Sequence, residues 1–405
     1  MFRLNSSLRT RPTSETLALA TAMAAPLGIT RVTDTTWLDR VGIPVFASIR
    51  PRAAAGSLCV SAGKGLKPEE AKVGATMEAI ELAIAERNRL PGSESVRLTP
   101  AEMLRKNGHT FDFVDLCPRY GAVVDPHAPI LCAQGEDLHT GGAQFIPAEL
   151  VFLPATGDLG QRIFGSTSSG LASGNDPLEA TVHALFELLE RDVQSFTYVS
   201  DRSHLVDLDD APATVLALTA KARAAGLALF LRFSKNAFGL PFFQAFLLEE
   251  DPEAPISVAV GTGCHAVREV AAVRAITEAA QSRLSHIHGG RDDIIHRVRY
   301  FEARAPAVER LGIRQLRERV ARSDPRVSYQ DVPDLGARVG SLREALDVAL
   351  EALARIGARH VVRCVLTPCD SPLAVVKVVV PRLEAYDASL RRVGPRLVDH
   401  VRACS

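Results

Sequence analysis

One segment, residues 175–192, restricts the fold and the chemistry of this chain more than any other. Its residues read as a helix, and at about 100° per residue one group of polar side chains shares an arc of about 80°. The group contains three carboxylates and an imidazole, from Glu179, His183, Glu187 and Glu190. Crowded like charge is costly unless a cation neutralises it, and such oxygen ligands suit Mg²⁺. A solvated acidic face is the alternative, and this helix alone does not exclude it.

A second predicted helix, residues 68–86, carries Glu78 and Glu81 three positions apart on one face. Pro68 suits the first turn of that helix. Lys64 stands between two glycines just before the helix, where the helix N-terminus attracts phosphate. The spacing of a Walker loop is absent, so this short glycine and lysine loop is by itself a weak indication of a nucleotide site.

The third predicted helix, residues 266–287, has four polar side chains within a stripe of about 60°. They belong to Arg274, Glu278, Gln281 and Ser285. An exposed helix face with one Arg–Glu pair is the alternative to a binding site here. Arg283 falls nearly opposite the stripe, so it serves another surface unless the helix is irregular.

Helices and strands are mixed along the whole chain, without the regular alternation of a doubly wound sheet. We therefore predict an α/β (mixed α+β) fold that forms one large body, since no internal repeat or long linker is present. The expected parts are a helical lead-in over residues 1–42, a main domain over 43–380 and a tail over 381–405. The lead-in helix should begin at Thr13 and stop near Gly28.

Composition excludes several classes of protein. The formal net charge is zero, which does not favour coating of nucleic acid or of an anionic membrane. No apolar run reaches the roughly 20 residues that span a bilayer. The seven cysteines are scattered without a CxxC pair, which argues against a disulfide framework or a zinc ribbon. Together these features favour a cytoplasmic protein, with no nucleic-acid or membrane partner.

Three segments in order resemble the YcaO family. They are Ser-Ala-Gly-Lys-Gly-Leu-Lys-Pro-Glu-Glu-Ala with the following Met-Glu-Ala-Ile-Glu, then Gly-Leu-Ala-Ser-Gly-Asn with the acidic helix, and finally residues 274–293. The similarity covers about 43–380. It implies a YcaO-like body with acidic ATP-binding helices and the cofactors ATP and Mg²⁺. It also implies an enzyme that activates a peptide backbone amide by phosphorylating its oxygen, after which a nucleophile attacks the amide carbon.

The resemblance also assigns residues, position by position. Its Mg²⁺ ligands would be Glu78, Glu81, Glu187 and Glu190. Its nucleotide contacts would be Asn175, Glu179, Arg191, Arg274 and Glu278, with Lys64, Gln281 and Arg283 as further candidates. It names no catalytic residue in this chain. The chain departs from the family's usual residues at three positions, with Gly74 in place of Ser, Leu82 in place of Arg and Ser169 in place of Asn. These departures affect individual nucleotide contacts and leave the acidic cluster unchanged.

The variant Met-Glu-Ala-Ile-Glu-Leu is similar to YcaO proteins that work with a TfuA partner, a branch associated with thioamides. The chain ends without the Pro-x-Pro-x-Pro tail of many azoline-forming members, which also favours a thioamide. We therefore expect a TfuA-like partner, a precursor peptide or protein as substrate, and a homodimer. An azoline-forming cyclodehydratase is one alternative. The other is a non-catalytic nucleotide-binding accessory protein, including a factor for sulfur insertion into a ribosomal protein.

Overall fold

The chain forms two compact units that alternate along the sequence. The computed structural model describes residues 1–405 except 94, 109, 292–293, 295–305, 387–388 and 405. The first unit contains Met1–Ala53, Leu58–Ala79 and Arg202–Gly340, and the second contains Ala54–Ser57, Ile80–Asp201 and Ser341–Ser405. No single cut in the sequence separates them, and the mixed α+β fold is confirmed. The predicted boundaries at residues 43 and 380 remain a prediction.

The largest sheet of the first unit has five strands in the order β13-β12-β11-β10-β14. They are β10 (His204–Asp207), β11 (Leu227–Phe233), β12 (Phe242–Glu249), β13 (Val258–Cys264) and β14 (Arg326–Ser328). Neighbouring strands are antiparallel, except that β10 and β14 are parallel. The inner strand β12, which lies between β13 and β11, is buried almost throughout, and this agrees with its nearly continuous apolar sequence.

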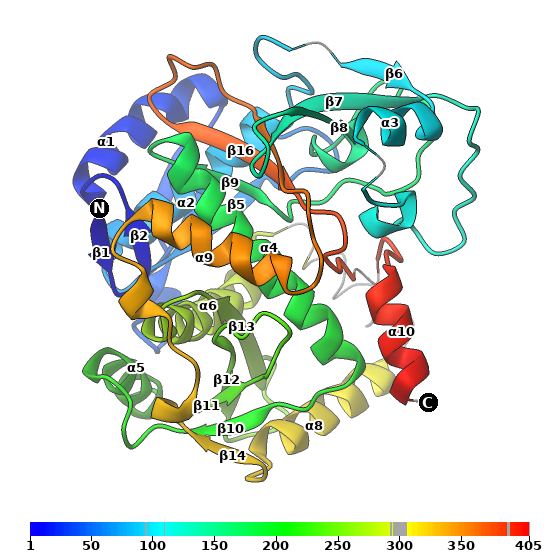
Figure 1. Cartoon of the computed structure of the whole chain (residues 1–405). Helices are drawn as coiled ribbons and strands as arrows, with labels where there is room; N and C mark the ends of the chain where they lie inside the picture. The colour runs from blue at the N-terminus through cyan, green and yellow to red at the C-terminus, as the bar shows by residue number, and fades with distance from the viewer. Residues whose placement is uncertain (94, 109, 292–293, 295–305, 387–388, 405) are drawn as a thin grey trace. The chain divides into compact units, whose positions relative to one another are not determined.

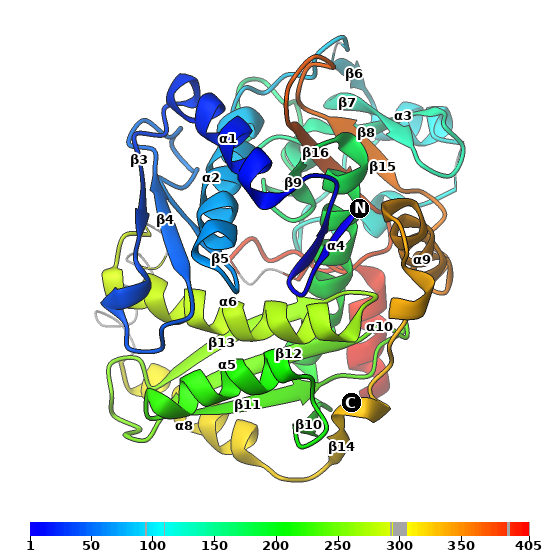
Figure 2. The same cartoon turned by 90° about the vertical axis from the view of Figure 1, so that its left-hand side faces the viewer.

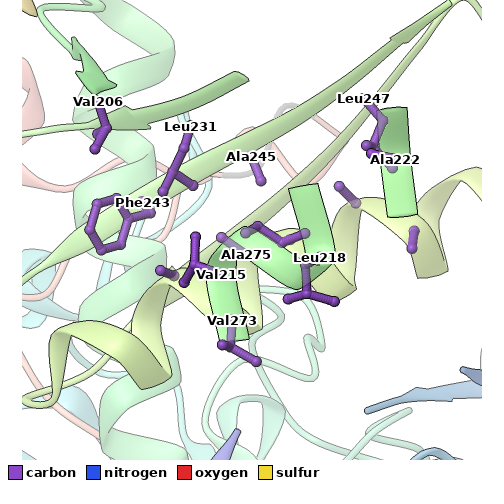
Figure 3. Packing of buried hydrophobic residues seen from close by; sticks show 14 of the residues in the cluster. Val206, Val215, Leu218, Ala222, Leu231, Phe243, Ala245, Leu247, Val273 and Ala275 are labelled. Atoms are coloured by element: carbon purple, nitrogen blue, oxygen red, sulfur yellow. The ribbon is translucent and has the colours of Figure 1, made fainter. Parts of the chain in front are cut away.

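Helices cover both faces of this sheet. Because alternate strand residues point to opposite faces, Phe243 and Leu247 pack against α5 (Ala213–Ala224) and α6 (Arg268–His288). Phe246 and Leu248 on the other face pack against Val320 of α8 (Pro306–Ala321). Figure 3 shows Phe243 and other strand side chains directed toward the helices. Figure 2 shows α5 and α6 lying along the sheet.

A smaller antiparallel sheet in the first unit precedes the first candidate helix. It consists of β3 (Arg31–Asp34), β4 (Val45–Ile49) and β5 (Val60–Lys64). The helix α2 (Pro68–Ala85) buries Ala71 and Ala75 against Phe46 of this sheet. The unit boundary falls inside α2, between Ala79 and Ile80.

The first residues of the chain form a hairpin and a helix. The hairpin joins β1 (Phe2–Leu4) to β2 (Ser7–Arg9). The helix α1 (Thr13–Ala24) begins at the predicted residue, continues into a 3₁₀ turn, and ends where Gly28 adopts a left-handed conformation. Within the described residues the 3₁₀ turns are η1 (Ala25–Leu27), η2 (Thr36–Leu38), η3 (Phe113–Leu116), η4 (Ala148–Leu150), η5 (Tyr329–Asp331) and η6 (Gly336–Arg338).

The second unit is built on an antiparallel sheet of six strands. Five follow the order β6-β7-β15-β16-β9, and β8 pairs with β7 beside them. Their bounds are β6 (Val96–Leu98), β7 (Ile130–Asp137), β8 (Ala143–Pro147), β9 (Leu171–Gly174), β15 (Val362–Val365) and β16 (Ala374–Val379). The long helix α4 (Pro177–Val199) packs on β9 and β16.

Three further helices complete the second unit. The helix α9 (Leu342–Ala354) packs on α4 and buries its apolar face. The helix α10 (Pro395–Cys404) contacts α4, and α3 (Pro100–Lys106) contacts β8 and β6. Figure 1 shows α9 and α10 beside α4. Within the part of the chain that the structure describes, no helix is both long and apolar enough to cross a membrane.

Candidate functional site

Each of the three helices that carry candidate residues crosses the strand before it at a glycine. In the first unit, a Cβ on Gly63 of β5 would lie 2.0 Å from the Ala75 nitrogen of α2. A Cβ on Gly261 of β13 would lie 2.2 Å from the Ala279 nitrogen of α6. In the second unit, a Cβ on Gly174 of β9 would lie 2.6 Å from the Ala180 nitrogen of α4. The main chains therefore touch, which only glycine permits.

Close packing of strand and helix lets glutamates of the helices accept hydrogen bonds from the strands. Glu78 Oε2 accepts from the Ala62 N–H at 3.2 Å. Glu278 Oε1 accepts from the N–H and the hydroxyl of Thr262 at 3.4 and 3.3 Å. These two carboxylates are therefore held at defined positions on the first unit.

Lys64 and Gln281 complete this first cluster. Lys64 Nζ lies 2.6 Å from Glu278 Oε2, with both side chains about a quarter exposed or less. The Gln281 amide donates to the carbonyl of Ala62, the residue whose N–H binds Glu78. Four predicted site residues from three elements thus gather around β5.

The surroundings of Glu78 shift its pKa in opposite directions. Burial raises the pKa of Glu78 above its usual range, while Arg291, Lys64 and the Ala62 N–H lower it and Glu278 raises it. Arg291 belongs to the third resembling segment, but Asp292 and Asp293 of that segment lie outside the described residues. A cation at this position would favour the ionised form of Glu78.

Arg274 has the character of an anion-binding group. Its Nε atom is buried and has no hydrogen-bond acceptor among the residues that the structure describes. An unmet buried guanidinium donor is costly, so an acceptor from a bound ligand would stabilise it. This observation fits a phosphate-bearing ligand at the first unit.

Arg283 lies on the opposite face of α6, as its position on the helix predicted. Its guanidinium is buried and bonds Asp39 at 2.9 Å, Glu249 at 2.7 Å and the Ile256 carbonyl at 3.1 Å. All three of its nitrogen atoms are engaged within the first unit. We therefore leave Arg283 out of the nucleotide contacts proposed below.

The second unit presents its candidates mainly on α4. The helix is capped by Asp176, which accepts from the Glu179 N–H at 2.8 Å, and it begins with Pro177. Asn175 donates to both oxygens of Glu179, at 3.2 and 3.0 Å. Glu179 and Glu190 are each 2% exposed, so the solvated acidic face does not describe this helix.

Glu187 and Arg191 lie one turn apart on α4. Arg191 Nε lies 3.8 Å from Glu187 Oε1, and Arg191 also donates to Gln194 at 3.0 Å. Glu81, from the end of α2 that belongs to this unit, accepts from the N–H and hydroxyl of Ser173 at 2.8 and 2.6 Å. The strand β9 thus fixes a carboxylate of α2 in the way that β5 fixes Glu78.

Lys377 is a charged residue of this unit that the sequence reasoning missed. It stands in β16 and is 1% exposed, and its ammonium donates to the Thr167 carbonyl. Burial lowers the pKa of Lys377 to about 7, although the charge of Glu187 raises it. A signal was present, because a lysine inside a run of valines is unusual for a buried strand.

The donor chemistry of the carboxylate pairs fits Mg²⁺. Over the described ranges, no group of three His, Cys, Asp or Glu side chains forms a metal site by itself. Mg²⁺ is commonly bound through one or two carboxylates together with water and substrate phosphates. Glu78 with Glu81, and Glu187 with Glu190, are spaced i,i+3 and offer such pairs.

Comparison with protein families and relatives identifies the wider group. A family model described as YcaO cyclodehydratase, ATP- and Mg²⁺-binding, matches residues 62–384. An uncharacterised protein of Methanothermobacter thermautotrophicus is 32% identical over 397 residues, which cover 95% of this chain and 97% of the relative. A Rhizobium leguminosarum bv. trifolii protein, described as lying in the tfuA 3′ region, is 32% identical over 400 residues. That alignment covers 96% of this chain and 92% of the relative.

Solved structures share the fold. The structure of YcaO from Methanopyrus kandleri bound with AMPPCP and Mg²⁺ has a TM-score of 0.74 at 24% identity, covering 97% of both chains. A heterocyclase in complex with substrate and cofactor also has a TM-score of 0.74, at 19% identity, covering 98% of this chain and 56% of the other. At these identities the likeness concerns the fold alone.

Proposed function

The chain belongs to the YcaO family of ATP- and Mg²⁺-binding proteins, and from this premise we propose that it modifies a backbone amide of a peptide or protein substrate. The observation that carries the proposal is the pair of carboxylates, Glu78 and Glu81, that strand N–H groups hold in place. Fixed carboxylates on a helix face are what metal-assisted phosphoryl transfer requires, because that chemistry depends on positioning and charge neutralisation.

We assign the following roles to the residues of the chain. Glu78, Glu81, Glu187 and Glu190 would hold Mg²⁺, while the proposed nucleotide contacts are Lys64, Asn175, Glu179, Arg191, Arg274, Glu278 and Gln281. Bound ATP and Mg²⁺ would supply a phosphoryl group and neutralise its charge. Asn175 fixes the orientation of Glu179, and Lys64 fixes that of Glu278. Arg191 would stabilise the negative charge that develops during transfer.

The product that we favour is a thioamide, in which sulfur replaces the amide oxygen and that oxygen leaves with phosphate. The Rhizobium relative beside tfuA supports this choice, as does the Met-Glu-Ala-Ile-Glu-Leu sequence of α2. On the same basis we propose a TfuA-like partner and a precursor peptide or protein substrate. We also propose a homodimer, which sedimentation of the purified chain would test, and a cytoplasmic location.

Reconstitution tests the proposal directly. The purified chain would be incubated with a precursor peptide, ATP, Mg²⁺ and sulfide, with and without the TfuA-like protein, and the peptide mass recorded. Exchange of oxygen for sulfur increases the mass, whereas azoline formation decreases it through loss of water. A gain in mass that needs the partner is expected. A water-loss product from the chain alone would refute both the thioamide and the partner requirement.

Two variants make this assay specific to the site. Glu187→Gln removes a proposed metal ligand with little change in shape and should abolish product formation. Glu318→Gln removes an exposed carboxylate from α8 and should leave product formation unchanged. Binding of ATP without any turnover, under all substrate conditions, would identify the non-catalytic accessory protein instead.

A further inference from the structure

A pocket of about 50 Å³ lies in the second unit beside the acidic helix. The helix α4 contributes Leu188 and Arg191 to its lining, and β16 contributes Lys377. Thr167 and Ser169, from the Gly- and Ser-rich loop before β9, form another side. The proposed Mg²⁺ ligand Glu187 lies near the pocket, because its charge acts on Lys377.

Lys377 is the least exposed cation of this pocket. Its position is fixed by the sheet, because Lys377 pairs with Cys364 of β15 and Leu171 of β9. An ammonium has three N–H donors, yet Thr167 provides the one acceptor that the described residues place within hydrogen-bonding distance. Two donors on a side chain that is 1% exposed thus lack an acceptor from the described protein.

Arg392 and Glu384 also line the pocket, and both already form hydrogen bonds with main-chain groups. Arg392 donates to the carbonyls of Cys117 and Leu116, each at 2.9 Å. Glu384 accepts from the N–H groups of Gly394 at 2.7 Å and Leu397 at 3.0 Å. Glu384 is therefore not the acceptor that Lys377 lacks. Asp115 also lines the pocket, and it accepts from the Asp112 N–H at 3.0 Å.

We infer that this pocket binds a small anion between Lys377 and Arg191, and that in the proposed reaction the anion is hydrosulfide, the attacking nucleophile. The identity of the anion rests on the proposed function, whereas the anion site rests on the donors and the cavity. Hydrogen bonds from an ammonium and a guanidinium to an anion are charge-assisted, and they are stronger than hydrogen bonds between neutral groups.

The size of the pocket agrees with this occupant. On the same scale one water molecule needs about 10–15 Å³, so the pocket has room for a small anion together with water. Burial lowers the pKa of Lys377 to about 7, and an anion beside the amine would restore its protonated form at neutral pH.

Crystals of the full chain soaked in bromide test the anion site without any reaction. Anomalous scattering should place a bromide within hydrogen-bonding distance of Lys377 Nζ in the wild type. Lys377→Met keeps the length of the side chain without the charge and should lose the peak. Lys106→Met, which removes an exposed lysine of the same unit, should keep it. An empty wild-type pocket, or a peak that persists in Lys377→Met, would overturn the inference.

Steady-state kinetics test the identity of the anion. Loss of one charge-assisted hydrogen bond should raise the KM for sulfide about 10-fold or more in Lys377→Met, with the KM for ATP unchanged. Equal changes in both constants, or in neither, would contradict the assignment. Bromide in the pocket of a chain that forms no thioamide would refute the proposed function but not the anion site. Thioamide formation by a chain whose pocket stays empty would refute the anion site but not the proposed function.

Discussion

Gly63 of β5 and Gly74 of α2 meet main chain to main chain. A Cβ on Gly74 would lie 3.3 Å from the Gly63 Cα, and a Cβ on Gly63 would lie 2.0 Å from the Ala75 nitrogen. The two glycines set the depth at which α2 sits on the strand, and this depth allows Glu78 to reach the Ala62 N–H.

The two glycines should differ in their tolerance of a methyl group. Gly63→Ala cannot be accommodated unless α2 moves, so it should lower the free energy of unfolding by about 3 kcal/mol or more and weaken ATP binding. Gly74→Ala requires a shift of only a few tenths of an ångström and should cost about 1 kcal/mol or less. Urea unfolding of both variants measures this difference, and equal losses would contradict the crossing geometry.

ATP should bind only together with a divalent cation. The carboxylates Glu78 and Glu81, held by strand N–H groups, would repel a triphosphate that carries no metal. Calorimetric titration with ATP in Mg²⁺ should therefore show binding that disappears in chelator. Equal affinity in both buffers would mean that these carboxylates do not hold the metal.

Lys64→Met should weaken binding of Mg²⁺ and ATP without unfolding the protein. Lys64 pairs with Glu278 at 2.6 Å and lowers the pKa of Glu78, so its loss leaves two carboxylates less well compensated. We expect the affinity for Mg²⁺ and ATP to fall about 10-fold. The melting temperature should change little, because partly exposed ion pairs contribute about 1 kcal/mol or less to the free energy of unfolding. Lys67→Met, three residues away and exposed, is the matched control. A similar loss of ATP affinity in both variants would show that the total charge of the region, rather than the contact of Lys64 with Glu278, controls binding.

The protein should lose stability in acid through His265. Burial, with the charges of Arg274 and Arg3, lowers the pKa of His265 to about 3. As pH falls below about 6.5, the unfolded chain binds a proton that the folded chain does not, so the folded state loses about 2–3 kcal/mol by pH 4.5.

His265→Asn removes this titration and retains an acceptor for the Val267 N–H, which now bonds His265 Nδ1 at 3.0 Å. The loss of unfolding free energy between pH 7 and 4.5 should be smaller in the variant than in the wild type. Denaturant unfolding at both pH values checks this expectation, and identical losses would show that His265 is protonated in the folded state.

Sequence reasoning found the helices because their signals are local. The predicted helix at residues 68–86 and the observed α2 differ by one residue at the end, and Asp176 and Pro177 mark the start of α4. The same reasoning missed β9, where small residues gave a loop-like sequence and pairing with β16 makes the strand. Pairing of this kind depends on residues two hundred positions away.

In the candidate site, too, local spacing predicted some features, while contacts between distant parts of the sequence could not be predicted. Helical spacing placed Glu278 and Gln281 on one face of α6 and Arg283 on the other, as observed. It could not identify the partners of Arg283, because Asp39 lies far away in the sequence. Nor could spacing on helices reveal Lys377, whose importance arises from the sheet around it and from the loop at Thr167.

A partly buried ion pair joins the helix α10 to the acidic helix α4. Arg396 of α10 bonds Asp192 of α4 at 2.5 Å and the Arg382 carbonyl at 3.0 Å, while Glu384 binds the N–H of Leu397 at 3.0 Å. Shortening the chain before Arg396 would remove the ion-pair partner of Asp192, whose side chain is buried and would keep the Glu384 N–H as a donor. Affinity tags and protease sites therefore belong beyond Val401, where the side chains face water.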